Sequence, residues 1–97
     1  MVANRLYTIY ILRCSDGSFY TGITNNLKHR LAVHAAGKAA KYTRARLPVE
    51  LVWCRSRQDS TKARKLEWAI KQLSRQQKYM LIADNTNLWK HLRTNAI

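Results

Sequence analysis

The chain opens with a pattern of alternating polar and apolar residues. Residues 6–14 (LYTIYILRC) alternate and are rich in β-branched and aromatic side chains, as half-buried strands are. The turn pair Asp16-Gly17 follows, and residues 19–23 (FYTGI) predict the returning strand of a β-hairpin. Gly22 in this second strand indicates either a bulge or a close approach of other atoms to the backbone.

The pattern then changes to the period of a helix. Six further segments follow: a capped helix over residues 27–37, a basic loop over 38–48, a strand over 49–53, a second capped helix over 62–74, and shorter helical pieces over 75–85 and 87–93. This β-β-α-β-α-α order predicts a small α/β domain of the α+β type, in which helices flank a three-stranded, mainly antiparallel sheet. A length of 97 residues predicts a single domain, residues 1–97.

The hairpin brings two tyrosines together. Because the turn pair sets the register, Tyr20 is expected opposite Leu12 or Arg13, with Tyr10 about one same-face step away. The two phenols can therefore share a face of the sheet. The alternative is that both are structural, as most tyrosines in strands are.

Composition adds one strong signal, which is charge. Eighteen Lys and Arg residues face five Asp and Glu residues, for a formal net charge of +13. A field of this sign attracts polyanions, so nucleic acid is the first candidate partner. A membrane surface is disfavoured, because the basic residues form no single amphipathic helix and no apolar run approaches the roughly 20 residues of a membrane span. Cys14 and Cys54 have no metal-binding spacing and are expected to be reduced thiols of a cytoplasmic protein.

The first predicted helix carries two candidate site residues. At about 100° per residue, one side of it presents four side chains: Leu27, Arg30, Leu31 and His34. The two leucines are expected to face the sheet, which places Arg30 and His34 at the edge of the buried stripe, one turn apart. The alternative is that Arg30 extends along the surface with its charge in water and that His34 is a surface residue.

The second predicted helix offers a single acid. Glu67 flanks the apolar stripe and is the only Asp or Glu between Thr61 and Lys78, a stretch rich in Lys and Arg. Such a carboxylate is expected to stay ionised and can anchor a hard divalent cation whose other ligands are water and phosphate. The alternative is a surface ion pair with Lys71, one helical turn later.

The predicted basic loop surrounds an aromatic residue, Tyr42, with four cations: Lys38, Lys41, Arg44 and Arg46. Cations bind the backbone of a flexible strand and a ring can stack on a base, so the loop favours single-stranded, flapped or branched DNA over a long duplex site. Solvated surface charge is the alternative. The three tryptophans are expected in the core: Trp53, Trp68 and Trp89.

Together, these residues resemble the GIY-YIG nuclease family. The chain has TIYIL, then YTG about ten residues later, and then an arginine, a histidine and a helical glutamate. The matching positions are Tyr10 at the end of the first motif, Tyr20 and Gly22 in the second, Arg30 and His34 in the following helix, and Glu67 at the metal-binding glutamate. Thr8 and Thr21 depart from the motifs, and Ile23 stands where some relatives have a catalytic lysine. The resemblance covers about residues 6–83, with residues 84–97 as an extension, and is strongest to the stand-alone bacterial branch.

The resemblance implies a DNA endonuclease that hydrolyses phosphodiester bonds with one Mg²⁺ or Mn²⁺ held by Glu67. It also implies a role in DNA repair or recombination. It implies that Tyr10 acts as general base with His34 accepting or relaying its proton, that Tyr20 positions water or phosphate, and that Arg30 contacts the scissile phosphate. The reverse assignment of the two tyrosines is left open by the sequence. Gly22 and Lys71, with the loop residues, are expected to contact the nucleic acid.

Two rival interpretations remain at this point. The first is a nucleic-acid-binding module that keeps the fold without catalysis, and the second is a nuclease that acts on RNA. In each case we expect a monomer or weak dimer with no small-molecule cofactor and no membrane partner.

Overall fold

The computed structural model describes residues 6–83 and 86–95 of the chain. Its strands are β1 (Tyr7–Arg13), β2 (Phe19–Thr24) and β3 (Glu50–Gln58), and its helices are α1 (Leu27–Ala35), α2 (Lys41–Arg44), α3 (Ser60–Lys71), α4 (Arg75–Ile82) and α5 (Thr86–Asn95). The three strands form an antiparallel sheet in the order β2-β1-β3. The predicted α+β class and antiparallel sheet are confirmed.

Two elements differ from the prediction. The expected loop over residues 38–48 contains the one-turn helix α2, in which the hydroxyl of Thr43 donates to the carbonyl oxygen of Ala40 at 3.1 Å. The third strand continues to Gln58, where residue 53 was the expected end. Its second half is polar, but it pairs with the whole of β1, as far as Tyr7 opposite Gln58. Partner strands, and not the local pattern, therefore set the length of β3.

The hairpin register is the predicted one. Leu12 lies opposite Tyr20, and Tyr10 lies opposite Gly22 in a regular stretch of the β1–β2 ladder. Because directly opposed residues share a face, Tyr10 and Tyr20 project to the same side of the sheet. Gly22 therefore does not mark a bulge.

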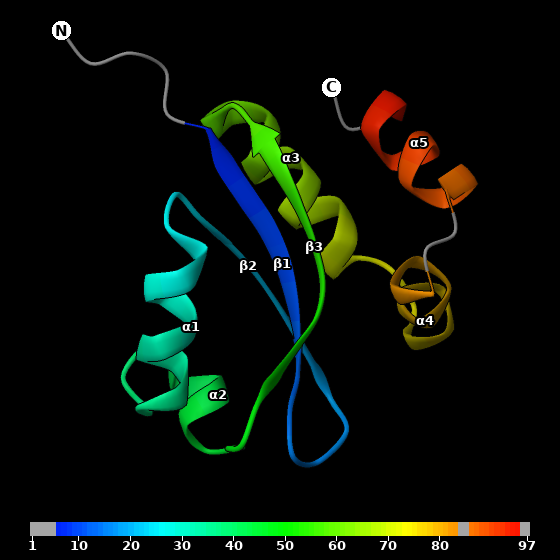
Figure 1. Cartoon of the computed structure of the whole chain (residues 1–97). Helices are drawn as coiled ribbons and strands as arrows, with labels where there is room; N and C mark the ends of the chain where they lie inside the picture. Colours follow the sequence, from blue (N-terminus) through cyan, green and yellow to red (C-terminus); the bar gives the residue numbers. More distant parts are fainter. Residues whose placement is uncertain (1–5, 84–85, 96–97) are drawn as a thin grey trace, which may run out of the picture.

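The two faces of the sheet are covered by different helices. Ile9 and Ile11 belong to the main core, where they pack with α3 residues such as Leu66 and Ile70. Tyr10 and Leu12 alternate with them and project to the other face, which α1 and α2 cover. Figure 1 shows this division, with α1 and α2 on one side of the sheet and α3, α4 and α5 on the other.

The tryptophans divide between core and surface. Trp53 and Trp89 are buried and pack edge to face, with ring centroids 5.3 Å apart. Trp68, which was expected in the core, is 66% exposed on α3, so that prediction is wrong. Trp68 lies between the buried positions Leu66 and Ile70 on the helix, and a residue two positions from each points away from them.

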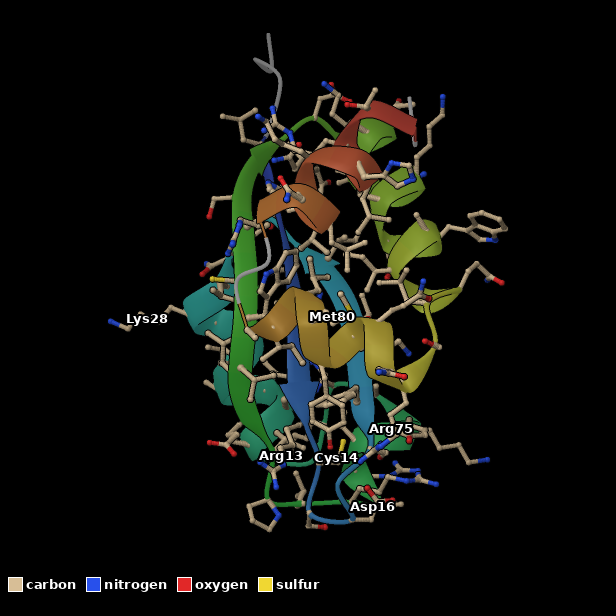
Figure 2. All side chains as sticks on the ribbon, turned by 90° about the vertical axis from the view of Figure 1, so that its right-hand side faces the viewer. Arg13, Cys14, Asp16, Lys28, Arg75 and Met80 are labelled. Carbon is tan, nitrogen blue, oxygen red and sulfur yellow. The ribbon has the colours of Figure 1, made fainter. Side chains whose placement is uncertain are left out.

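The hairpin turn is held by residues far along the chain. Arg75, at the start of α4, donates from Nη2 to the carbonyl oxygen of Gly17 at 2.9 Å. Figure 2 shows Arg75 beside Asp16 at this turn. The cysteines Cys14 and Cys54 are free, as expected. Among the described residues, none of the helices is long and apolar enough to cross a membrane.

Candidate active site

A chain of three buried side chains joins the sheet to α1 and α2. The hydroxyl of Tyr10 lies 2.8 Å from Nε2 of His34, and Nδ1 of His34 lies 3.0 Å from Oγ1 of Thr43. All three side chains are almost fully buried. His34 was predicted at the edge of the buried stripe, but it is the buried residue of α1.

The hydrogen bonds determine where the protons lie. The hydroxyl of Thr43 donates to the carbonyl of Ala40, so its oxygen is left to accept from His34. His34 therefore carries its proton on Nδ1, and its bare Nε2 accepts from the hydroxyl of Tyr10. The result is a directed chain in which each hydroxyl or ring N–H donates to the next group.

Electrostatics agree with this arrangement. Burial raises the pKa of Tyr10, with the neighbouring Tyr20 and Glu67 adding to the rise and the charge of Arg30 opposing it. Burial also lowers the pKa of His34 from its ordinary 6.5, and the charge of Arg30 lowers it further. At neutral pH the phenol is protonated and the imidazole is neutral, as the hydrogen bonds require.

Gly22 makes room for the hydroxyl of Tyr10. A Cβ atom at position 22 would lie 2.5 Å from Oη and 2.6 Å from Cζ of Tyr10. The ring of Tyr10 thus crosses the strand backbone where a side chain would stand. This confirms a close approach as the reason for Gly22, and it explains the glycine without any contact to nucleic acid.

Tyr20 extends the site towards the surface. Its ring lies edge to face with the His34 ring, with centroids 5.3 Å apart, and 6.4 Å from the ring of Tyr10. On its outer side it stacks with Tyr42, at a centroid distance of 6.2 Å and an interplanar angle of 24°. Tyr20 is partly exposed, whereas Tyr10 is buried.

Arg30 and Glu67 supply opposite charges to the same site. Arg30 is exposed on α1, and Glu67 is partly buried on α3; both charges act on the Tyr10 phenol. The Glu67 carboxylate lies 3.5 Å from the ammonium of Lys71, so the ion pair considered as an alternative role does form. At a side-chain exposure of 51%, Lys71 is free to turn away, and such a pair is worth at most about 0.5 kcal/mol.

Around Glu67 the described residues offer few ligands for a cation. Among residues 6–83 and 86–95, no three His, Cys, Asp or Glu side chains gather into a group that could enclose a metal ion. Glu67 can therefore contribute a single carboxylate. Mg²⁺ accepts this, because it commonly binds one or two carboxylates and takes its remaining ligands from water and substrate phosphate.

The predicted basic loop separates into two parts. Lys38, Lys41 and Arg44 are exposed and can meet a polyanion. Arg46 instead lies with its guanidinium carbon 3.8 Å above the ring of Tyr42. Its Nε donates to Oδ2 of Asp16 at 3.0 Å, which ties α2 to the hairpin turn. Of the four cations, Arg46 thus has a structural role in holding Tyr42.

Thr43 is the site residue that sequence reasoning missed. It is a small polar residue in a short, mostly polar segment, and nothing in its spacing marks it as a partner of His34. Its neighbours Tyr42 and Arg44 have the aromatic ring and the charge that indicate binding of nucleic acid, whereas Thr43 has neither. Only the packing of α2 against α1 brings the Thr43 hydroxyl to the imidazole.

Comparisons with known proteins agree with the motifs. A family model described as the GIY-YIG catalytic domain matches residues 6–80. A UPF0213 protein from Lacticaseibacillus paracasei is 42% identical over 89 residues, which is 92% of this chain and 100% of that protein. One from Oceanobacillus iheyensis is 51% identical over 74 residues, or 76% of this chain and 86% of the relative. The NMR structure of a UPF0213 protein from Bacillus halodurans, 37% identical, superimposes with a TM-score of 0.55 over 95% of this chain and 96% of that one.

Proposed function

Because the chain belongs to the GIY-YIG family, whose domains are generally those of nucleases that use divalent metals, we propose that it is a metal-dependent DNA endonuclease. The reaction is hydrolysis of a phosphodiester bond. The observation that carries this proposal is the contact between the Tyr10 hydroxyl and a neutral His34. A phenol that activates water needs an acceptor for its own proton, and His34 is that acceptor.

Tyr10 is the group we assign as general base. With its pKa raised, the phenol is protonated at neutral pH and can take a proton from water only by passing its own proton on. Nε2 of His34, 2.8 Å away, carries no proton and already accepts the Tyr10 hydroxyl, so it is the group that receives the proton. The imidazolium formed keeps its other proton on Nδ1, bonded to Thr43.

Tyr20 and Arg30 are assigned to substrate. Tyr20 is partly exposed and lies against both Tyr10 and His34, where its hydroxyl can position the attacking water or a phosphate oxygen. Arg30 is exposed on α1, and its guanidinium can bind two oxygens of the scissile phosphate. Both residues are accessible to an anion in the folded structure, so neither has to be uncovered before the substrate binds.

Glu67 is the residue that would hold the metal, either Mg²⁺ or Mn²⁺. When bound there, a divalent cation supplies charge neutralisation for the phosphate and the leaving oxygen. Lys71, which pairs with Glu67 in the structure, then becomes free to contact a neighbouring phosphate.

Single-stranded, flapped or branched DNA is the substrate class that the surface supports. Lys38, Lys41 and Arg44 are exposed close to Tyr42 in sequence, and Tyr42 is itself 38% exposed beside Tyr20. Cations with an exposed ring suit a strand whose bases are unpaired.

The test is a cleavage assay on labelled single-stranded, duplex and flapped DNA, and on matched RNA, with Mg²⁺, Mn²⁺ or chelator. We expect metal-dependent cleavage of the single-stranded and flapped DNA. Glu67→Gln is expected to abolish cleavage while retaining DNA binding, and Glu50→Gln, which removes an exposed acid on β3, is the matched control. Salt-sensitive binding without cleavage under every metal would refute the nuclease, and faster cleavage of RNA would refute the substrate.

The two tyrosines are separated by their phenylalanine variants. Tyr10→Phe is expected to lower kcat by about 10²- to 10⁴-fold, the usual contribution of a general base. Tyr20→Phe removes the hydrogen bond that we propose to water or phosphate and is expected to lower kcat by about tenfold. The opposite ranking would assign the base to Tyr20.

A further inference from the structure

A hollow of about 250 Å³ lies directly beside the candidate site. Residues from four elements line it: Phe19, Tyr20 and Thr21 of β2, Tyr42 of α2, Lys71 of α3 and Lys78 of α4. Tyr20 is shared with the site, and Lys71 pairs with Glu67 at 3.5 Å. The hollow is thus continuous with the groups to which we assign catalysis.

One part of the hollow is an aromatic wall that the fold holds in place. Tyr20 and Tyr42 stack on each other. Arg46 lies over the Tyr42 ring and also donates from Nη1 to the Tyr42 carbonyl oxygen at 3.0 Å. Phe19 is held edge to face by Tyr79, with centroids 5.2 Å apart. Because these rings are already positioned, a flat ligand would bind without ordering them first.

The rest of the lining is cationic. Lys71 and Lys78 come from consecutive helices, and none of the lining residues is acidic. An anion between the two ammonium groups would meet charge of the opposite sign. The volume is below the usual 300–1,000 Å³ of sites for drug-sized ligands, so the hollow fits a fragment about the size of one nucleobase.

We propose that this hollow is a nucleotide subsite. It holds the nucleotide next to the scissile phosphate, with the base against the edges of the stacked Tyr20 and Tyr42 rings. The adjoining phosphate lies between Lys71 and Lys78. This inference rests on the proposed function and adds a physical reason for single-strand preference. A base inside a duplex is paired and stacked on its neighbours, whereas an unpaired base can enter the hollow. Since contact between a base and the edges of aromatic rings needs no particular donor or acceptor on the base, the subsite requires a base without selecting its identity.

The experiment measures binding, in chelator, to two short strands. One is an eight-unit abasic deoxyribose-phosphate strand, and the other is the same strand with a single central thymine. With one base present, the strand binds in one register. We expect the protein to bind the thymine-bearing strand about tenfold tighter, which corresponds to an edge-to-face contact of one base with the rings together with the apolar area it buries.

Variants of the lining residues separate the contribution of the aromatic wall to strand binding from that of the lysines. Tyr42→Ala is expected to bind both strands equally, whereas Tyr42→Phe, which keeps the ring, retains the tenfold difference. Lys78→Met is expected to weaken both strands alike and to reduce the salt dependence of binding by the share of about one phosphate contact. Trp68→Ala is the matched control, since it removes an exposed ring that does not line the hollow.

Three results would overturn the subsite. These are equal binding of both strands by the unchanged protein, a difference that survives in Tyr42→Ala, and a difference that Trp68→Ala removes. Circular dichroism of each variant shows that it is folded. Because no cleavage is needed, the two proposals fail separately: cleavage without a thymine effect refutes the subsite alone, and a thymine effect without cleavage refutes the nuclease alone.

Discussion

The hydroxyl oxygen of Tyr10 lies 2.8 Å from Nε2 of His34, and each of these side chains is 1% exposed. This contact joins the central strand to α1 by a hydrogen bond between two buried side chains. Buried polar groups are costly unless each finds a partner, and the Thr43 hydroxyl completes the set. The chain of bonds therefore gives the imidazole one defined tautomer.

Thr43→Val is the direct test of the tautomer. Valine keeps the shape of threonine but cannot accept from Nδ1, which leaves a buried N–H unsatisfied. We expect a loss of about 1–3 kcal/mol in the free energy of unfolding and a fall in kcat without a matching change in KM. Imidazole ¹⁵N shifts report the tautomer directly, and Thr43→Ser, which keeps the hydroxyl, is expected to restore them. An unchanged Nδ1–H signal in Thr43→Val would show that Thr43 has no positioning role.

The burial of His34 predicts a pH dependence of stability. Its pKa in the folded protein is below 6.5, so the unfolded chain takes up the proton first as the pH falls. The stability that depends on a neutral His34 is therefore expected to be complete above about pH 6.5. The free energy of unfolding is expected to decrease as the pH drops from there towards the pKa of folded His34. Asp16, whose pKa is lowered from 3.8, contributes only at more acidic pH.

Urea unfolding between pH 4.5 and 7 measures this dependence. The groups that surround the imidazole are Tyr10, Tyr20, Arg30 and Thr43. His34→Gln keeps polar atoms at the position but has no charge to gain, so part of the slope is expected to disappear. Identical slopes in the two proteins would assign the dependence to other groups.

Gly22→Ala tests the space over the strand. The added methyl group would lie 2.5 Å from the Tyr10 hydroxyl, so the ring must move and the bond to His34 must lengthen or break. We expect a loss of about 1–3 kcal/mol in stability and a loss of cleavage. In a Tyr10→Leu background the same substitution is expected to cost much less, because the ring is gone. Equal costs in both backgrounds would contradict the clash.

Because Trp53 is buried and Trp68 is exposed, replacing each by alanine is expected to change stability by very different amounts. Trp53→Ala removes a buried ring that packs on Trp89 and is expected to cost about 3–5 kcal/mol. Trp68→Ala removes a ring that is 66% exposed and is expected to change stability by less than about 0.5 kcal/mol. Thermal unfolding of the two variants side by side measures the difference. A large loss in Trp68→Ala would place that ring in an interface.

Several features of the fold could be predicted because they depend on neighbours in sequence. The turn pair Asp16-Gly17 sets the hairpin register, and hence the shared face of Tyr10 and Tyr20. Asn26 and Asp59 cap α1 and α3 through bonds to residues three positions later. Other features depend on distant partners. The polar end of β3 is a strand because β1 pairs with it, and Trp68 is exposed because α3 presents other residues to the core.

The sequence by itself determined the α+β class, the hairpin, the family motifs and the identity of most candidate site residues. It left open whether His34 is a surface residue and which tyrosine has a proton acceptor. Only the tertiary structure decided these points, by packing α1 and α2 on one face of the sheet so that Tyr10, His34 and Thr43 meet in a buried place. The physical reason is that these hydrogen bonds and this burial form between different elements, so they cannot be predicted from the sequence pattern of any one element.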